Sequence, residues 1–202
     1  MTRHMTLLTT AVLASSLSMA ATAAPADPWA GWTSTMSTIS RIASTGQTPS
    51  RQMPTSGSAS YQGGTAGTAT HNDQVGAIVG GVSMDVNFRT RQIAGTLTNL
   101  RSADTNAALA GSLEPVNLGI NATYLGSTIN GAVSGVVVTP TTTVSTGTGV
   151  GDTLSLSSTT TTLLNGKING AFFGKGAKAM AGTWDASGGT LSVGGSFGAY
   201  KR

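Results

Sequence analysis

The chain has 202 residues, of which 28 are Gly, none is Cys and only 9% are charged. This length predicts a single domain. Threonine and serine are abundant. Both are poor helix formers, and threonine favours strands, so an all-α fold or a coiled coil is excluded. The absence of cysteine excludes a disulfide scaffold, a thiolate metal site and a cysteine nucleophile.

The N-terminus has the features of a secretory signal peptide over residues 1–23. Arg3 and His4 give a positive start, Leu7–Ala14 is mostly apolar, and residues 21–23 form an A-x-A cleavage site. A membrane anchor is the alternative, but the apolar stretch is too short to cross ~30 Å of hydrocarbon. We therefore expect an exported protein, either secreted, at the cell surface or in the periplasm. No cysteine follows the cleavage site, so we expect no lipid anchor. We also expect no membrane span after cleavage.

Basic residues outnumber acidic ones, which gives a formal net charge of +4. They are scattered along the sequence, whereas a nucleic-acid-binding protein clusters them. We therefore expect no nucleic-acid partner.

Residues 24–58 are rich in Ser, Thr, Pro and Gly and predict a leader before the main domain. Within it, apolar residues recur at three- and four-residue spacing, as on one face of an amphipathic helix, namely Trp29, Trp32, Met36, Ile39 and Ala43. We expect this segment to cover one end of the domain. A helix that docks onto a partner is the alternative. Residues 44–58 predict a linker, because glycines and prolines interrupt them.

From residue 59 onward the apolar period changes to two, which indicates strands with one apolar and one polar face. Val116, Leu118 and Ile120, for example, alternate with Asn117 and Gly119. The pattern predicts eight strands, near residues 60–70, 77–88, 92–98, 116–124, 129–137, 168–172, 180–184 and 191–199.

Eight antiparallel strands favour closure into an up-and-down β-barrel, because closure removes the exposed sheet edges. The predicted fold class is all-β, with the apolar faces inward and with glycines on those faces where strands crowd. A small outer-membrane barrel is the alternative. It needs apolar faces outward and two aromatic girdles, and only 5% of the residues are aromatic.

Two long connections are expected, at residues 100–115 and 139–165. Loops of this length are usually functional or disordered. Residues 154–163 also fit an extra hairpin, and the sequence does not choose between the two.

Small residues with Phe or Trp at fixed spacing form several motifs, namely Gly170–Gly174, Ala181–Trp184, Gly194–Ala199, Met84–Phe88 and Ile93–Leu97. This pattern resembles the β-barrel domain of transferrin-binding protein B over residues 59–202. Factor H-binding surface lipoproteins and secreted hemophilin-type heme scavengers have the same barrel. The resemblance implies a binding protein whose partner differs between members: a host iron protein, a complement regulator or heme. No binding residue carries over, because the binding loops are where the members differ.

Residues with catalytic potential are few. His71 is the one histidine beyond the signal peptide, and His71-Asn72-Asp73 is most simply a polar turn. Histidine and acidic residues are too scarce to indicate a serine triad, so we expect no enzyme. The acidic residues are spread singly, so we expect no metal site.

The heme version of the resemblance selects four candidate residues. A heme ligand is His, Met, Tyr or Cys, which leaves His71 and Tyr61 as the main candidates. Lys175 and Lys178 fall in a predicted turn and are candidates for contacts with the heme propionates. We expect Tyr124 and Trp184 to lie in the core.

The sequence thus predicts a secreted, non-enzymatic protein that binds a solute or a partner protein. Iron or heme acquisition is the most concrete version, with an unknown host or bacterial protein, or a heme-like solute, as the partner. A cell-surface interaction or adhesion module without a small ligand is one alternative, and the small outer-membrane barrel is the other.

Overall fold

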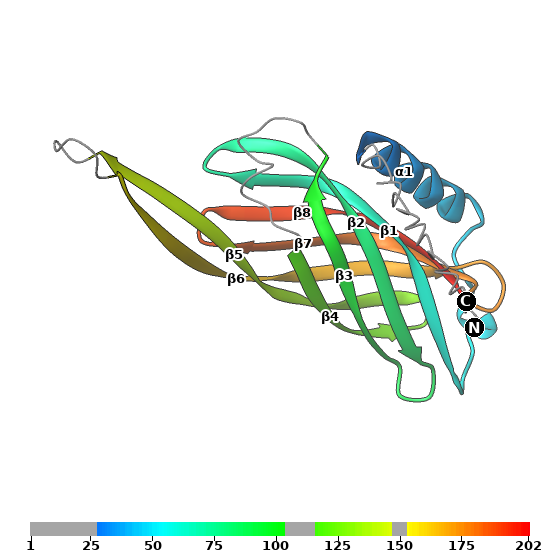
Figure 1. The fold of residues 1–202 in the computed structure, drawn as a ribbon. Helices are drawn as coiled ribbons and strands as arrows, with labels where there is room; N and C mark the ends of the chain where they lie inside the picture. Colours follow the sequence, from blue (N-terminus) through cyan, green and yellow to red (C-terminus); the bar gives the residue numbers. More distant parts are fainter. Residues whose placement is uncertain (1–27, 104–115, 147–152) are drawn as a thin grey trace, which may run out of the picture.

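The computed structural model describes residues 28–103, 116–146 and 153–202, with only the backbone for residues 28, 139–146 and 153–158. The expected signal peptide and most of the expected loop 100–115 lie outside the described residues. The described residues form one α-helix, a 3-10 helix and eight strands (Figure 1): α1 Pro28–Ser44, η1 Ser50–Gln52, β1 Ser58–His71, β2 Gln74–Asn87, β3 Gln92–Ser102, β4 Val116–Leu125, β5 Thr128–Thr146, β6 Thr153–Phe173, β7 Ala179–Gly188 and β8 Leu191–Lys201.

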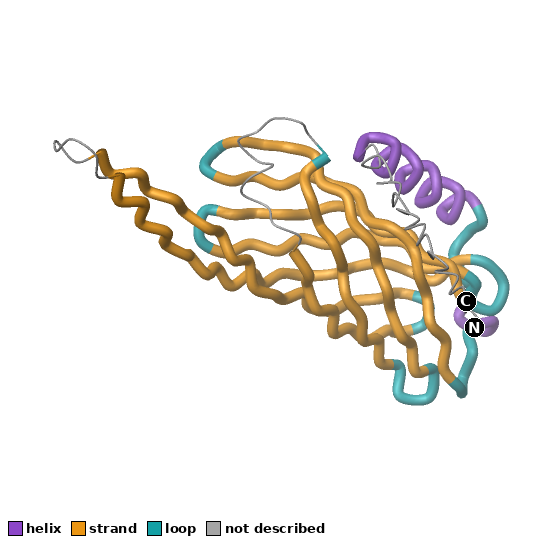
Figure 2. The backbone as a smooth tube through the Cα atoms, in the orientation of Figure 1, coloured by secondary structure: helices purple, strands orange, loops and turns teal. Residues whose placement is uncertain are grey.

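The eight strands form a closed antiparallel barrel (Figure 2). Each strand pairs with the next one in the sequence, and β8 pairs with β1 from Tyr61↔Lys201 to His71↔Leu191. The predicted eight-stranded up-and-down barrel is therefore confirmed. We call the end at which β8 finishes the C-terminal end. It carries the β2–β3, β4–β5 and β6–β7 turns. The opposite end is the ribbon end.

Apolar side chains fill the interior, as the alternating pattern predicted. Along β4, buried and exposed residues alternate without interruption. Near the C-terminal end, Tyr61, Phe88, Tyr124 and Phe172 form a cluster with ring centroids between 5.2 and 6.3 Å apart, mostly edge to face. Tyr124 and Trp184 lie in the core as predicted. This inward apolar pattern is the reverse of the one that an outer-membrane barrel needs.

Beyond the barrel, β5 and β6 continue as a two-stranded ribbon. The β4–β5 pairing ends at Gly135 and the β6–β7 pairing at Asn165. From Val136↔Leu163 to Thr146↔Thr153, β5 and β6 pair only with each other among the described residues. We call residues 136–146 and 153–163 the ribbon. It projects to the left in Figure 1.

The expectation of a long loop at residues 139–165 is therefore wrong. Most of these residues are paired strand, because runs of Thr, Ser and Val have high strand propensity. Residues 154–163 do pair, as the hairpin alternative required, and their partners are residues 136–145 of β5.

Helix α1 lies against the outer wall of the barrel and not over its end. It runs along β8 and β1, which places it over the seam where the barrel closes (Figure 1). Ile42 is fully buried against Ala179 and Ala181, while Trp32 and Met36 pack beside Ala66. The predicted apolar face is thus partly correct.

Two details of the predicted helix differ. Ala43 is exposed, and Ile42 takes the buried position instead. The reason lies in the wall, since Gly198 of β8 leaves the room that the Ile39 and Ile42 side chains occupy. The expectation that this segment covers one end of the domain is wrong because the small residues that accept it are on the side.

Residues 45–57 pack onto the C-terminal end and do not form a free linker. The Thr48 backbone N–H donates to the Phe172 carbonyl (2.8 Å), and its hydroxyl donates to the Gly174 carbonyl (2.7 Å). Met53 is buried in the main core. The prolines and glycines interrupt regular structure, as predicted, but the segment is fixed by these contacts.

A chain of buried hydrogen bonds joins three strands inside the barrel. The Trp184 Nε1–H on β7 donates to the Thr65 hydroxyl on β1 (2.7 Å), and that hydroxyl donates to the Ser196 carbonyl on β8 (2.9 Å). Thr65 is fully buried. Each of these polar groups therefore depends on the others for its partner.

We expect Thr65→Val to destabilise the protein by about 1–3 kcal/mol, because it leaves the buried indole N–H without an acceptor. The free energy of unfolding from urea titration measures the loss. Thr123→Val, on the exposed face of β4, is the matched control and should change stability by less than about 0.5 kcal/mol. Equal effects of the two substitutions would contradict the assigned role of Thr65.

Candidate functional site

The four residues expected to contact heme lie at opposite ends of the barrel. His71 ends β1 at the ribbon end, where it is half-buried beside the Asn72–Asp73 turn. Both turn residues have positive φ, at +49° and +65°. Tyr61, Lys175 and Lys178 lie at the C-terminal end. His71 is ten positions along β1 from Tyr61, which is about 33 Å at ~3.3 Å per residue. The structure therefore does not bring the four together, and heme contact by either group stays a prediction.

Tyr61 is fully buried, and its hydroxyl donates to the Ala177 carbonyl at 2.6 Å. Burial, and then the nearby Tyr124, raise the pKa of Tyr61 well above its usual range. The phenol stays protonated and holds the β6–β7 turn, in which Ala177 has a positive φ of +56°. Tyr61 is thus committed to positioning the turn that carries Lys175 and Lys178.

Tyr124 plays the same part for the β2–β3 turn. Its hydroxyl donates to the Phe88 carbonyl at 3.1 Å. Burial raises the pKa of Tyr124, and the Arg91 guanidinium lowers it in part. The two buried tyrosines therefore fix two of the three turns at the C-terminal end.

A pocket of about 580 Å³ opens beside these turns. Met53, Phe88 and Tyr124 supply apolar surface, and Arg89 and Arg91 supply two cations. Both arginines are exposed, and Arg91 has a positive φ of +59°. Apolar surface beside two guanidinium groups suits a group that is anionic at one end and apolar at the other.

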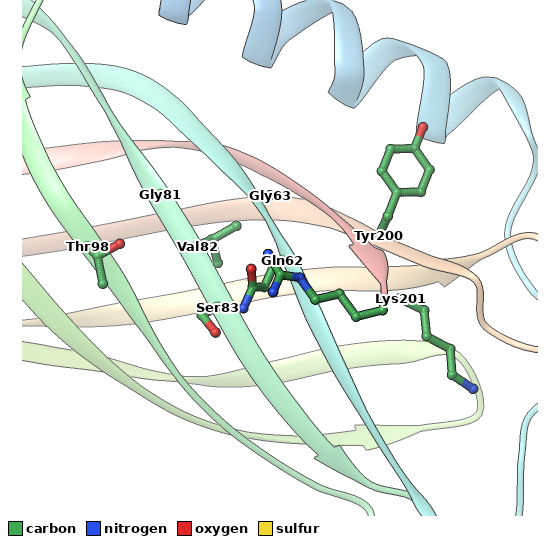
Figure 3. A pocket seen from close by; sticks show the side chains of 9 residues that line it. Gln62, Gly63, Gly81, Val82, Ser83, Thr98, Tyr200 and Lys201 are labelled. Atoms are coloured by element: carbon green, nitrogen blue, oxygen red, sulfur yellow. The ribbon is translucent and has the colours of Figure 1, made fainter. Parts of the chain in front are cut away.

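A second hollow of about 670 Å³ lies on the outer wall over β1, β2 and β3 (Figure 3). Polar side chains such as Gln62, Ser83 and Thr98 line it. Tyr200 points toward α1, and Arg41 Nε donates to its hydroxyl at 3.2 Å. Lys201 points away, and its Nζ lies 5.9 Å from the centroid of the Phe88 ring.

Eight of the ten described Arg and Lys residues lie at the C-terminal end or beside it, and all eight are exposed: Arg41, Arg51, Arg89, Arg91, Lys175, Lys178, Lys201 and Arg202. Among the described acidic residues only Asp85 lies near them, two residues before β2 ends. The cations that are scattered in sequence are thus gathered in space.

This gathering is not visible among neighbours along the chain. In an up-and-down barrel every second turn reaches the same end. Arg89 and Arg91 follow β2, while Lys175 and Lys178 follow β6, so a comparison of alternate turns contained the signal.

Within the described ranges, no group of three His, Asp or Glu side chains is placed to hold a metal ion. The helix that the structure describes is not long and apolar enough to cross a membrane. The described site is one of cations and apolar surface, which can bind an anionic group.

Comparison with known families gives one match. The family described as "C-lobe and N-lobe beta barrels of Tf-binding protein B" matches residues 53–201. The matched range begins at the buried Met53 and extends to the last residue of β8. Comparison with curated proteins gave no match.

Three solved structures illustrate the similarity. A mutant of transferrin-binding protein B from Haemophilus parasuis Hp5 has a TM-score of 0.51 at 20% identity, over 77% of this chain and 28% of that chain. Isotype 1 of the same protein from serogroup B Neisseria meningitidis has a TM-score of 0.48 at 20% identity, over 77% and 28%. A surface lipoprotein has a TM-score of 0.43 at 17% identity, over 78% and 66%. At these identities the likeness concerns the fold alone, and the chain spans less than a third of transferrin-binding protein B.

We expect the stability contributed by Tyr61 to be lost at alkaline pH. Its pKa is raised in the folded state, so its contribution is full below the ordinary value of 10.0 and falls as the pH rises beyond it. Tyr61→Phe should cost about 1 kcal/mol at neutral pH and should flatten the alkaline decline. Urea titrations across alkaline pH measure both effects. The exposed Tyr200 supplies the control, and Tyr200→Phe should keep the wild-type slope. An unchanged slope in Tyr61→Phe would contradict the assignment.

Proposed function

The chain belongs to the family of the β-barrels of transferrin-binding protein B, and from this premise we propose that it is an exported, non-enzymatic protein that binds a protein partner in iron acquisition. The matching family model and the similar structure from Haemophilus parasuis are both named for transferrin binding. We infer a partner of the same kind, a host protein that carries iron.

The packed interior supports binding on the outside of the barrel. Tyr61, Leu97, Leu118, Ile129 and Phe172 point inward and are fully buried. Eight strands enclose a space that such side chains can just fill. A partner therefore meets the outer wall, the ends or the ribbon.

The observation that carries the proposal is an apolar patch at the base of the ribbon. Val136, Val138 and Leu163 are exposed by 50%, 47% and 60%. Val136 and Leu163 pair directly, and Val138 is two residues further along β5, so the three share the outward face. Exposed apolar side chains that cluster in this way mark interaction sites.

The ribbon also offers backbone groups for binding. Among the described residues its strands pair only with each other, so each leaves one edge of N–H and C=O groups without a strand partner. Residues 136–146 and 153–163 contain no charged residue, so the usual protection of an edge by charge is missing there. An extended segment of a partner protein can pair with such an edge while its side chains contact the valines.

We expect the purified protein to bind iron-loaded transferrin, measured by biolayer interferometry, and the double variant Val138→Ser with Leu163→Ser to bind about tenfold or more weakly. Truncation of apolar anchors at the centre of an interface costs more than about 1 kcal/mol each. The control is Leu125→Ser, which removes an exposed apolar side chain from the opposite end. It should leave the affinity unchanged.

Two results would contradict different parts of this proposal. If transferrin does not bind the wild-type protein, the iron-protein version fails and an adhesion module with another partner takes its place. If transferrin binds but the double variant and Leu125→Ser are alike, the ribbon is not the contact surface.

The heme version predicts a saturable Soret shift on titration with hemin. Because His71 and the Lys175–Lys178 pair lie at opposite ends, a single site uses only one of them. We expect Lys175→Gln with Lys178→Gln to weaken hemin binding if the propionates contact that turn, and His71→Ala to abolish the shift if His71 ligates the iron. A titration without any shift would remove heme and leave the protein partner as the ligand.

A further inference from the structure

We propose that the C-terminal end of the barrel binds the surface of a membrane that contains anionic lipids. The partner surface proposed above lies at the ribbon end, so this second surface can act independently of it. The proposal is carried by the charge, the exposure and the arrangement of the three turns and flanking segments at the C-terminal end.

Two of the three turns at the C-terminal end supply cations, and an exposed apolar side chain lies beside the third. The β2–β3 turn carries Arg89 and Arg91, and the β6–β7 turn carries Lys175 and Lys178. The β4–β5 turn carries no charge, and Leu125, the last residue before it, is 75% exposed. Cations that surround an exposed apolar side chain are typical of protein surfaces that bind at a membrane interface.

The cations are available for lipid headgroups. Within the part of the chain that the structure describes, none of the eight forms an ion pair. Arg41 and Lys201 lie near the Tyr200 and Phe88 rings, and such ring contacts leave the positive charge in place. Asp85 is the one described acid nearby. Each Lys or Arg near an anionic surface is worth about a fivefold gain in binding.

The opposite end has no such gathering of cations: of the two other described basic residues, Arg101 lies one residue before β3 ends there and Lys167 lies within β6. Asn72 and Asp73 form its β1–β2 turn, and Gly189 and Thr190 form the β7–β8 turn, so neither turn carries a cation. The barrel is therefore electrically asymmetric along its length among the described residues. Long-range attraction to an anionic surface would orient it with the C-terminal end toward that surface.

The spread of the cations favours a membrane over an acidic protein. They come from α1, η1, two turns and the end of β8, and so surround the end instead of lining one cleft. The pocket at Arg89 and Arg91 adds a place for one lipid, with its phosphate at the guanidinium groups and its apolar part against Met53 and Phe88. An extended anionic surface with an apolar interior satisfies both features.

The test is co-sedimentation of the purified protein with vesicles. We expect binding to vesicles of phosphatidylcholine mixed with phosphatidylglycerol, little binding to phosphatidylcholine alone, and weakening by salt. Lys175→Gln with Lys178→Gln should reduce the vesicle affinity by roughly thirtyfold, at about fivefold for each cation. Leu125→Ser should reduce it further.

The matched control is Arg101→Gln with Lys167→Gln, which removes the same charge from the two described basic residues away from the C-terminal end. This pair should bind the vesicles almost as wild type does. Equal losses in the two double variants would overturn the proposal, as would equal binding to both kinds of vesicle. Binding to immobilised heparin without binding to anionic vesicles would also overturn it, and would identify the end as a site for an acidic macromolecule. Circular dichroism confirms that each variant folds.

Discussion

Closure of the sheet between β1 and β8 is the constraint that the rest of the structure depends on, because it decides both what is inside and what is outside. The two strands approach closely, and a Cβ on Gly67 would overlap with the backbone of Gly194 and Gly195. The hydrogen-bonded chain from Trp184 through Thr65 to Ser196 then fixes the seam from within. Once the sheet is closed, its interior is filled by side chains, and every binding function is moved to the ends and the outer wall.

The seam also explains the place of α1. A helix needs a surface onto which its apolar side chains can approach, and the outer faces of β1 and β8 offer glycines at Gly64 and Gly198. Ile42 fills the space that Gly198 leaves, and Thr35 lies over Gly64. Small residues at the seam thus have two effects. They allow β1 and β8 to approach and pair, and they form the surface against which α1 packs.

The sequence predicted the barrel well because a period of two over one apolar face is a local signal, visible in each strand by itself. The apolar spacing predicted the helix but placed Ala43 on its buried face instead of Ile42, because the spacing does not reveal where the barrel wall has room for a side chain. It took residues 139–165 for a loop, because a ribbon outside the barrel lacks the apolar alternation of a half-buried strand. The gathered cations were missed for a different reason, since Arg89 and Lys178 become neighbours at one end only through the order of the strands. No local pattern of the sequence identifies the ligand.

The order of strand pairing has a consequence for how the chain folds. Seven of the eight pairings join strands that are consecutive in the sequence, so each can form as soon as its two strands have been synthesised. The eighth brings together segments about as far apart as Thr65 and Ser196, which are separated by 131 positions, and so waits for the last strand. Until then β1 and β8 each present an open edge, the state in which β-proteins are most prone to aggregate. Helix α1 precedes β1 but packs across the seam, so its full packing surface exists only after β1 and β8 have paired. Its docking therefore comes late in folding and stabilises the closed barrel.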